Sequence, residues 1–520
     1  MNLPTNQIRP LSLHFSGLLL ALLLLSTPPS FSAPTKSSLW NEVIQGFSIK
    51  QRKDARLTPH LLWYKKNPDY LNRVLNRARP YLYHIVKRAK KKNLPLELAL
   101  LPAVESAFRA YAYSPGSAAG LWQFIPATGK IYGLKQNWWI DQRRSLLPST
   151  DAALYFLKDM SREFKGDWLL ALAAYNAGAG NVRKAIRHYY EDEKKKLKKK
   201  KQKRPIKKPT FWDLNLPRET QGYVPRILAL SRFIEQADKY NFQLPNIPNR
   251  PLTESVSTGN RQIDLSLAAE LAELPLEKIY ELNAGLNQWA TPPDGPHRLL
   301  LPISHAERFR NNLELAPAPL IEWRRHKVKS GESMSQIALK YSTTAGMIRK
   351  QNRMKNNKLR AGKEITIPIP RQPIGSYTLT ASARLDKLQN RKRSGVRHQH
   401  TVVKGETLWD IARKYGVSTK QLARWNGMAP GDMLRVGKPL VIWSRERPLP
   451  ELKRRPAFAT KMATQTIYYT VRANDTLSQI AEKFHTTTKA LMRQNKLKRG
   501  AVIKVGQSLA IRLDATQATQ

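Results

Sequence analysis

The chain has 520 residues, of which 41% are hydrophobic, so it is long enough for several packed domains and is not a single disordered tail. Lys and Arg number 89 against 38 Asp and Glu, a formal charge of +51, which favours polyanionic partners such as nucleic acid, phosphorylated lipid or an acidic cell-wall polymer. Cysteine is absent, which excludes disulfides, thiolate metal sites, a cysteine nucleophile and a lipidated N-terminal cysteine.

The N-terminus predicts a cleaved secretory signal over residues 1–32. Arg9 precedes the apolar run GLLLALLLL at residues 17–25, and small residues with a small-x-small site follow near Ser30. The apolar run is too short to span a membrane comfortably, and an uncleaved anchor is the alternative. Export would place the mature chain in the periplasm or cell envelope, where wall polymers are more accessible than nucleic acid.

The first half of the chain predicts an all-helical structure, because apolar residues recur every three or four positions. We expect an N-terminal helical segment over 33–85 and a helical domain over 86–240. Pro95 suits a helix start, and Pro102 should restart that helix about one turn before Glu105.

Glu105 lies in the stretch LPAVESAF, with Leu101 four residues before it and Phe108 three after it, so its helix face is apolar. A carboxyl beside apolar groups is poorly solvated when charged, which raises its pKa and favours a general acid. The alternative is a Glu that points to solvent from an amphipathic helix.

Two later stretches have the composition of a sugar-binding cleft. SPGSAAGLWQFIPATG, from Ser114, combines small residues that permit tight turns with aromatic groups and the amide Gln123. The same loop could instead pack under a core. LLALAAYNAGAGNVRKAI, from residue 169, predicts an apolar helix that ends in Tyr175 and Asn176, with Gly178 and Gly180 as its terminators.

A lysine-rich insertion covers residues 191–209 and includes KKKLKKKKQKRPIKKP. Charge blocks of this kind are commonly solvated, so we expect a solvent-exposed insertion, with contact to anionic envelope polymers as the next candidate and nucleic acid as the least compatible with export. Neither the histidines at 398–400 nor any other group has a metal-binding spacing. We therefore expect no metal and no other cofactor.

Three C-terminal segments repeat one pattern and are called unit 1 (326–369), unit 2 (400–443) and unit 3 (468–513). In each, an Asn follows the Ala of an Ile-Ala pair by 14 residues, as at 338 and 352 in unit 1. The patterning predicts the order strand, helix, helix, strand. A fainter copy over 255–304, the degenerate unit, keeps the same offset from Ala269 to Asn283 but lacks the opening motif, and an ordinary helical hairpin is its alternative.

The segments 371–399 and 444–466 are rich in base and proline and predict extended, mobile linkers. Units joined in this way would add avidity through their effective concentration.

The three units resemble LysM domains, small α+β modules of βααβ order. The resemblance implies binding of N-acetylglucosamine-containing glycans in a groove between the first strand–helix loop and the second helix–strand loop. The glycan-binding positions that it implies are Gly405, Glu406, Thr407 and Leu408 in unit 2, and Asp475, Thr476 and Leu477 in unit 3. Units 1 and 3 depart from the pattern at Ser333-Met334 and at Asn474.

Taken in order, Glu105-Ser106, Ser114, GLWQ, AYNAG and ETQGYV resemble the successive motifs of Slt-type lytic murein transglycosylases. The resemblance implies a goose-lysozyme-like fold with Glu105 as the catalytic acid. It implies a supporting or glycan-binding role for Ser106, Ser114, Gln123, Ile125, Tyr175, Asn176 and Tyr223. Trp122 stands where many members have Met, and we expect it to leave the cleft aromatic.

The resemblance also implies the chemistry. Glycosidases generally need two carboxylates, whereas a lytic transglycosylase uses one to cleave the MurNAc-(β1,4)-GlcNAc bond of peptidoglycan and leaves a 1,6-anhydro end. The next four carboxylates after Glu105 in sequence lie in no site-like motif; they are Asp141, Asp151, Asp159 and Glu163. We expect a monomer with peptidoglycan as its partner, and the alternatives are a lysozyme-type hydrolase and a non-catalytic wall-binding protein.

Overall fold

The structure is a computed structural model that describes residues 38–50, 54–114, 116–444, 465–471, 475–484, 486–497 and 501–513. The predicted signal segment and residues 445–464 of the second predicted linker lie outside these residues. Among the helices of the described segments, none combines the length and the apolar character needed to cross a membrane.

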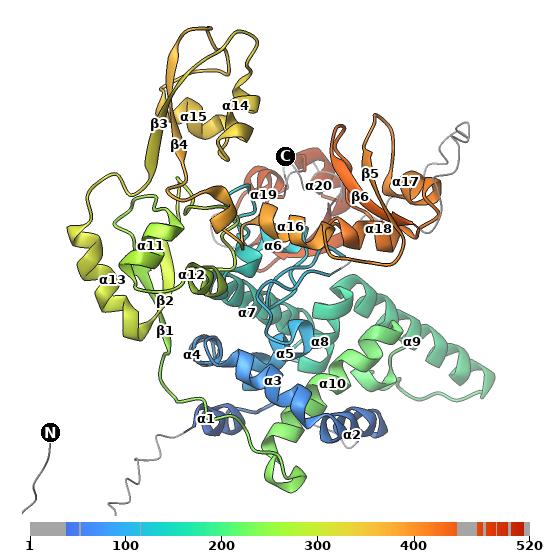
Figure 1. The fold of residues 1–520 in the computed structure, drawn as a ribbon. Helices are drawn as coiled ribbons and strands as arrows, with labels where there is room; N and C mark the ends of the chain where they lie inside the picture. Colours follow the sequence, from blue (N-terminus) through green and yellow to red (C-terminus); the bar gives the residue numbers. More distant parts are fainter. Residues whose placement is uncertain are drawn as a thin grey trace, which may run out of the picture.

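Residues 39–240 form a helical domain, as predicted, and Figure 1 shows it in blue to green. Its α-helices are α1 (Leu39–Gln45), α2 (Thr58–Lys66), α3 (Pro68–Ala78), α4 (Leu82–Lys91), α5 (Leu101–Ser106), α6 (Pro126–Ile131), α7 (Leu146–Glu163), α8 (Trp168–Ala177), α9 (Ala179–Lys199) and α10 (Arg218–Glu235). Its 3₁₀ helices are η1 (Ala55–Leu57), η2 (Leu96–Leu100), η3 (Gln142–Arg144), η4 (Phe211–Asp213) and η5 (Asp238–Tyr240).

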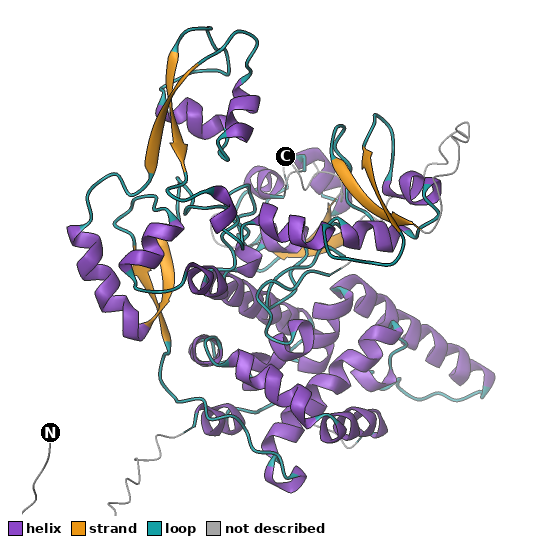
Figure 2. Cartoon of the chain, in the orientation of Figure 1, coloured by secondary structure: helices purple, strands orange, loops and turns teal. Residues whose placement is uncertain are grey.

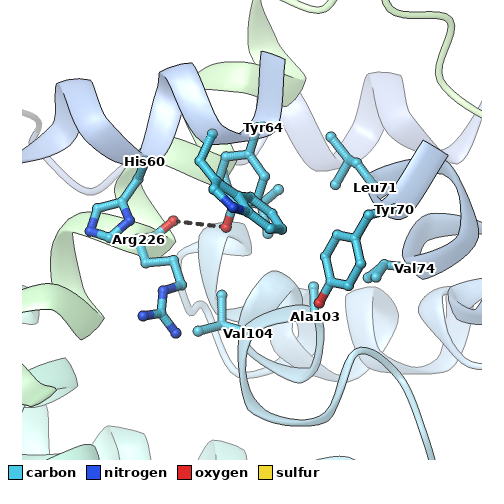
Figure 3. Close-up of a pocket in the computed structure, with 10 residues that line it drawn as sticks. His60, Tyr64, Tyr70, Leu71, Val74, Ala103, Val104 and Arg226 are labelled. Atoms are coloured by element: carbon cyan, nitrogen blue, oxygen red, sulfur yellow. Dashed lines mark hydrogen bonds between the residues drawn. The ribbon is translucent and has the colours of Figure 1, made fainter. Parts of the chain in front are cut away.

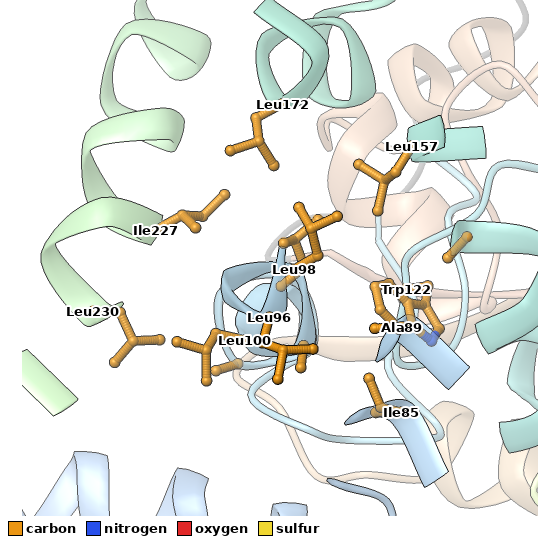
Figure 4. Packing of buried hydrophobic residues seen from close by; sticks show 14 of the residues in the cluster. Ile85, Ala89, Leu96, Leu98, Leu100, Trp122, Leu157, Leu172, Ile227 and Leu230 are labelled. Atoms are coloured by element: carbon orange, nitrogen blue, oxygen red, sulfur yellow. The ribbon is translucent and has the colours of Figure 1, made fainter. Parts of the chain in front are cut away.

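The centre of this domain is η2, whose leucines are buried among α4, α7, α8 and α10 (Figure 4). Pro95 precedes η2, and Pro102 occupies the first turn of α5, where its missing N–H costs no helical hydrogen bond. The predicted start and restart are therefore confirmed. The short helix α5 follows η2 directly, so the buried leucines of η2 support Glu105, which lies in the last turn of α5.

The helix α8 ends at Gly178, which has a φ of 83°, as predicted. Gly180 was predicted to end it too, and this was wrong, because Gly180 lies in the first turn of α9. One residue with a positive φ suffices to reverse the chain, after which a new helix starts. Since Lys propagates helices well, α9 continues to Lys199, so the first half of the lysine-rich insertion is an exposed helix.

The C-terminal half contains four βααβ units, each closed by one antiparallel strand pair (Figure 2). The degenerate unit has β1 (Thr253–Ser257), α11 (Leu265–Leu271), α12 (Leu276–Leu282) and β2 (Arg298–Pro302), and α13 (Ile303–Leu315) follows it. Unit 1 has β3 (Glu322–Lys327), α14 (Met334–Lys340), α15 (Ala345–Gln351) and β4 (Glu364–Ile369). Unit 2 has β5 (Val396–Thr401), α17 (Leu408–Lys414), α18 (Thr419–Trp425) and β6 (Pro439–Ser444). Unit 3 has β7 (Gln465–Thr470), α19 (Leu477–Lys483), α20 (Thr488–Gln494) and β8 (Ser508–Leu513).

The Asn at the fixed offset clamps the second helix of each unit to its last strand. In unit 2, Asn426 donates to Leu422 O at 2.9 Å and to Val441 O at 2.8 Å, and it accepts from Val441 N at 2.7 Å. Asn352 and Asn495 make the same set of bonds in units 1 and 3. Asn283 of the degenerate unit bonds Leu300 in the same way. The repeated spacing therefore reports one structural clamp, since a buried amide must satisfy both its donors and its acceptor.

The prediction of an extended tether over 371–399 was wrong. This segment contains η6 (Ile374–Ser376) and α16 (Ala381–Gln389). Tyr377 is 0% exposed, and its hydroxyl donates to the carboxylate of Asp264 at 2.8 Å. The basic composition of the segment gave no sign that Tyr377 would be buried. The burial of its ring and its charge-assisted hydrogen bond together outweigh the entropy lost when the segment is ordered.

Each of units 1 to 3 contacts another part of the chain. Unit 1 accepts a hydrogen bond at Ser342 O from Trp289 of the degenerate unit, at 2.7 Å. In unit 2, Asp432 accepts one from Ser117 of the helical domain, at 2.8 Å. In unit 3, the guanidinium of Arg183 on α9 lies 3.4 Å from the ring centre of Tyr468. Figure 1 accordingly shows units 2 and 3 beside the helical domain and unit 1 projecting from the degenerate unit.

Candidate active site

Glu105 occupies the last turn of α5, just before Ala107 ends the helix with a φ of 51°. Its side chain is partly exposed, and Oε1 accepts a 2.5 Å hydrogen bond from the hydroxyl of Tyr223 on α10. Tyr223 is 4% exposed and is held in the domain core. The structure therefore brings together two of the predicted site residues from motifs that are 118 residues apart.

The protein environment makes Glu105 a weaker acid than an ordinary glutamic acid. Although the residue is partly exposed, the surrounding protein desolvates its carboxyl, which raises the pKa to about 7, and the hydrogen bond from Tyr223 opposes that rise. The negative charge of Glu219 raises the pKa further, and the positive charge of Arg226 lowers it. At neutral pH, a large share of the molecules thus carries a proton on Glu105, as a general acid requires.

Glu219 is the site carboxylate that the sequence analysis missed, although it lies in the ETQGYV motif. It is exposed on α10 one turn before Tyr223, and it accepts a long 3.4 Å hydrogen bond from Asn176. Asn176 in turn accepts from Thr220 at 2.7 Å, which joins the end of α8 to α10. The spacing of four residues between Glu219 and Tyr223 was a usable signal, since such residues share one helix face.

The four carboxylates that follow Glu105 in sequence all have cationic partners. Arg143 contacts Asp141 at 2.8 Å, Arg88 contacts Asp151 at 3.4 Å, Arg162 contacts Asp159 at 3.9 Å, and Arg183 contacts Glu163. Burial acts to raise the pKa of Asp141, but its hydrogen bonds with Arg143 and the charge of Arg143 hold that pKa below the ordinary value. These four carboxylates serve ion pairs and do not contact Glu105.

The buried Arg143 shapes the loop that carries the GLWQ motif. Its guanidinium donates to Ser117 O at 2.7 Å and to Phe124 O at 3.1 Å. The backbone of Gly120 passes so close that an added Cβ would lie 2.0 Å from Arg143 O. The predicted need for a small residue in a tight turn is met at this position, where Gly120 also has a φ of 82°.

Three predicted site residues use their polar side chains to hold this loop. Ser106 donates to Pro102 O at 3.0 Å and to Leu121 O at 2.9 Å, and it is buried. Ser114 accepts from Gly116 N at 3.2 Å and from Ala118 N at 3.1 Å. Gln123 donates to Gly120 O at 2.8 Å. These contacts show how the side chains position the loop.

Trp122 does not line the cleft, contrary to the prediction. It is 0% exposed, and its indole N–H donates to the Thr150 hydroxyl at 3.1 Å; Phe124 is buried as well. Both rings fill the core under the loop, which was the alternative given for this stretch, because a large apolar ring gains more from burial than from exposure. Ile125 is partly exposed at the start of α6.

Tyr175 joins the group around Glu105. Its hydroxyl donates to Trp122 O at 2.6 Å, and its pKa is raised well above the ordinary value by burial and then by the charge of Glu105. The hydroxyl therefore stays protonated and can only donate one hydrogen bond at a time. The site consists of one weak acid, two neutral tyrosines and an exposed second carboxylate.

In unit 2 the predicted glycan-binding residues have structural contacts. Glu406 accepts from His400 Nε2 at 2.8 Å and from Val403 N at 2.9 Å. Thr407 caps α17 by accepting from Asp410 N at 3.2 Å, and Leu408 is buried. Gly405 is exposed and has a φ of 85°.

Unit 3 has the same arrangement of contacts as unit 2 but uses different side chains. Asp475 accepts from the Tyr469 hydroxyl at 2.6 Å, in place of the histidine contact in unit 2. Thr476 accepts from Gln479 N at 3.2 Å at the start of α19, and Leu477 packs on the core of the unit. Across the segments that the structure describes, no cluster of three or more His, Asp or Glu residues could hold a metal ion.

Comparison with protein families matches three kinds of domain. The family described as "Transglycosylase SLT domain" matches residues 83–198. The LysM domain matches 326–368, 400–443 and 469–512. The family described as "Lytic transglycosylase MltD, LysM-like domain" matches 253–318, which is the degenerate unit with α13.

Individual relatives cover different parts of the chain. The "Membrane-bound lytic murein transglycosylase D" of Escherichia coli (strain K12) is 34% identical over 411 residues, which are 76% of this chain and 84% of that protein. A protein of Alteromonas sp. (strain M-1), named for tributyltin chloride resistance, is 49% identical over 110 residues, 21% of this chain and 53% of its own. The solved structure of an inactive mutant of lytic transglycosylase Slt from Pseudomonas aeruginosa covers 31% of this chain and 24% of its own, at 24% identity, with a TM-score of only 0.23.

Proposed function

The chain belongs to the family of membrane-bound lytic murein transglycosylase D, and from this membership we propose that Glu105 is its catalytic acid and base. The protein is a lytic transglycosylase that binds peptidoglycan. The observation that carries the proposal is the carboxyl of Glu105, whose pKa is raised to about 7 and which accepts a hydrogen bond from the buried Tyr223.

The proposed reaction needs one carboxyl. Glu105 donates its proton to the oxygen between C1 of MurNAc and GlcNAc, and the C1–O bond breaks. The resulting carboxylate accepts the proton of the MurNAc C6 hydroxyl as that oxygen bonds to C1. The product carries a 1,6-anhydro end, no water is consumed, and Glu105 regains its proton. Tyr223 serves this cycle because its hydrogen bond stabilises the charged form between the two steps.

The remaining site residues support the cycle in two ways. We expect Ile125, Tyr175 and Asn176 to contact the glycan, because they surround Glu105 or its loop and are not fully buried. Ser106, Ser114 and Gln123 act as positioning residues, since their polar groups hold the loop around the GLWQ motif. Units 2 and 3 add binding to the same polymer, through the loops that contain Gly405 and Asp475.

The test is mass analysis of the soluble products from purified sacculi. Anhydro ends are expected from the wild-type chain, and Glu105→Gln should release none while it still binds sacculi. Reducing ends would instead establish a hydrolase, a second candidate that the charge of Glu219 near Glu105 favours, because hydrolysis uses two carboxylates. Absence of any product from the wild type would leave a wall-binding protein.

We propose further that the protein acts as a monomer in the periplasm or cell envelope, as the predicted signal and the envelope polymer that it binds suggest. The exposed lysines of α9 would contact anionic envelope polymers. Replacing the lysines at 194–201 with Gln should reduce the salt-sensitive part of binding to sacculi. Unchanged binding at low salt would show that this segment is only solvated.

A further inference from the structure

A pocket with a volume of about 330 Å³ lies between α2, α3, α5 and α10 (Figure 3). This volume is at the lower end of the range of small-molecule sites, about 300–1,000 Å³. Its base is apolar and buried, formed by Leu71, Val74, Ala103 and Leu230. The helices α2 and α3 precede the matched SLT segment, so the N-terminal segment contributes one wall of the pocket.

The wall from α2 and α3 is aromatic and partly open. Trp63 is 46% exposed and Tyr70 is 37% exposed, and their ring centres lie 5.1 Å apart in an edge-to-face arrangement. Trp63 makes a second edge contact, at 5.6 Å, with the buried Tyr64. Large rings that are held in place yet exposed to solvent are typical of binding surfaces.

The opposite end of the pocket carries the positive charge of Arg226. His60 lies beside it in Figure 3, across Val104 from Tyr70. The charge of Arg226, after burial, lowers the pKa of His60, so the two groups are close. Within the described part of the chain, Arg226 forms no ion pair, although its guanidinium is a preferred partner of carboxylates.

Arg77 lies near the C-terminal end of α5 and does not line the pocket. Arg77 shares one face of α3 with Tyr70 and Val74, and its Nη1 donates to Ala107 O at 3.3 Å, just beyond Glu105. Burial and the charges of Arg109 and Arg73 lower the pKa of Arg77, which shows how cation-rich this side is. Val104, which lines the pocket, directly precedes Glu105, and the charge of Arg226 lowers the pKa of Glu105, so the cationic end of the pocket lies beside the catalytic carboxyl.

We propose that this pocket binds the acidic peptide stem of a MurNAc residue held near Glu105. A stem has carboxylates for Arg226 and short aliphatic groups for the apolar base. A neutral sugar ring would use the aromatic wall but would leave the guanidinium of Arg226 without a carboxylate partner. The inference rests on the proposed function, because only a peptidoglycan strand in the cleft brings a stem to this place.

Direct binding can be measured without turnover. Stem peptides released from sacculi by an amidase are titrated into the full-length Glu105→Gln chain by calorimetry. We expect saturable binding that Arg226→Gln weakens by about tenfold or more, as is usual for the loss of a charge-assisted bond. The matched control, Arg187→Gln on the exposed face of α9, should leave it unchanged. The proposal is overturned if no binding is detected, or if neither Arg226→Gln nor Tyr70→Ala changes the affinity.

A kinetic comparison separates the peptide from the glycan. kcat/KM is measured with peptide-bearing strands and with strands stripped by the amidase, for the wild type, Trp63→Ala and Tyr70→Ala, with matching thermal unfolding curves as a check on folding. We expect the variants to lose rate mainly on the peptide-bearing strands. Equal losses on both substrates would assign the pocket to a sugar ring and overturn the proposal. A wild type that yields no anhydro product refutes the proposed function instead, and the calorimetry still tests the pocket.

Discussion

Two glutamates, one in the helical domain and one in unit 2, show how the same side chain is given opposite properties. Glu105 accepts a hydrogen bond from Tyr223, and burial raises its pKa to about 7. Glu406 is also desolvated, which acts to raise its pKa, but bonds from Val403 N and His400 hold that pKa below the ordinary value. A desolvated carboxyl with too few hydrogen-bond donors has a raised pKa and can act as an acid. A desolvated carboxyl with enough donors stays ionised and serves the structure.

The largest expected effect follows from replacing the acid. Glu105→Gln should reduce the release of soluble fragments from sacculi by about 10³-fold, because general acid–base catalysis contributes about 10²–10⁴-fold. Glu406→Gln is the matched control and should leave kcat on short soluble strands unchanged. If the two substitutions reduced turnover equally, the contrast between the two carboxyls would have no catalytic meaning.

The same substitution should stabilise the protein in alkaline solution. Because the pKa of Glu105 is raised in the folded state, its ionisation opposes folding, so stability is highest below its unfolded pKa and falls as the pH rises towards about 7. Glu105→Gln removes this term and should increase the free energy of unfolding by about 1–3 kcal/mol at pH 8.

The measurement is denaturant unfolding of both chains at pH 4 and pH 8. Near pH 4 the wild-type carboxyl is protonated in both states, so the two chains should then differ little. A stabilisation of the same size at both pH values would show that the pKa of Glu105 is not raised.

Tyr223→Phe removes the hydrogen bond that stabilises the charged form of Glu105. The pKa of Glu105 should therefore rise, and the pH at which activity is lost should move upward. We also expect a fall in kcat of about tenfold, the size of one charge-assisted hydrogen bond. A full pH profile of kcat/KM measures both effects.

Glu219→Gln should shift the pH profile of kcat/KM in the opposite direction, since it removes a negative charge that raises the pKa of Glu105. The alkaline limb should move downward in this variant. Shifts of the same sign in both variants would contradict the assignment of that limb to Glu105.

The smallest effect is expected in unit 2. Glu406→Gln should lower the free energy of local opening by about 1 kcal/mol at pH 7, seen as faster amide exchange in β5 and β6. Because the pKa of Glu406 is lowered in the fold, the wild type should itself lose this stabilisation as the pH falls below the ordinary carboxyl range. Unit 1 keeps the equivalent contact between His326 and Glu332, at 2.8 Å, and provides the internal control. Equal changes in both units would indicate a global effect.

Local patterns predicted much of the fold. The three- and four-residue spacing predicted the helical domain, and the prolines predicted the break before α5. The fixed Ala-to-Asn offset identified the repeats and the apolar patterning predicted their βααβ order, and the structure explains the offset, because each Asn reaches the same strand. The burial of Trp122 and of Tyr377 was not predictable in the same way, since a pattern shows that a residue is aromatic but not which core will accept it.

The sequence by itself determined that one carboxyl stands on an apolar helix, ahead of motifs for a glycan cleft and of repeated binding units. The apolar helix face, the motifs and the repeats all depend on residues that are close in sequence, so they can be identified from local patterns. Only the tertiary structure decided that Tyr223 and Glu219 adjust the pKa of Glu105, and that Arg226 lines a pocket beside it. A pKa depends on which groups surround a carboxyl in space, and these groups come from helices that only folding brings together.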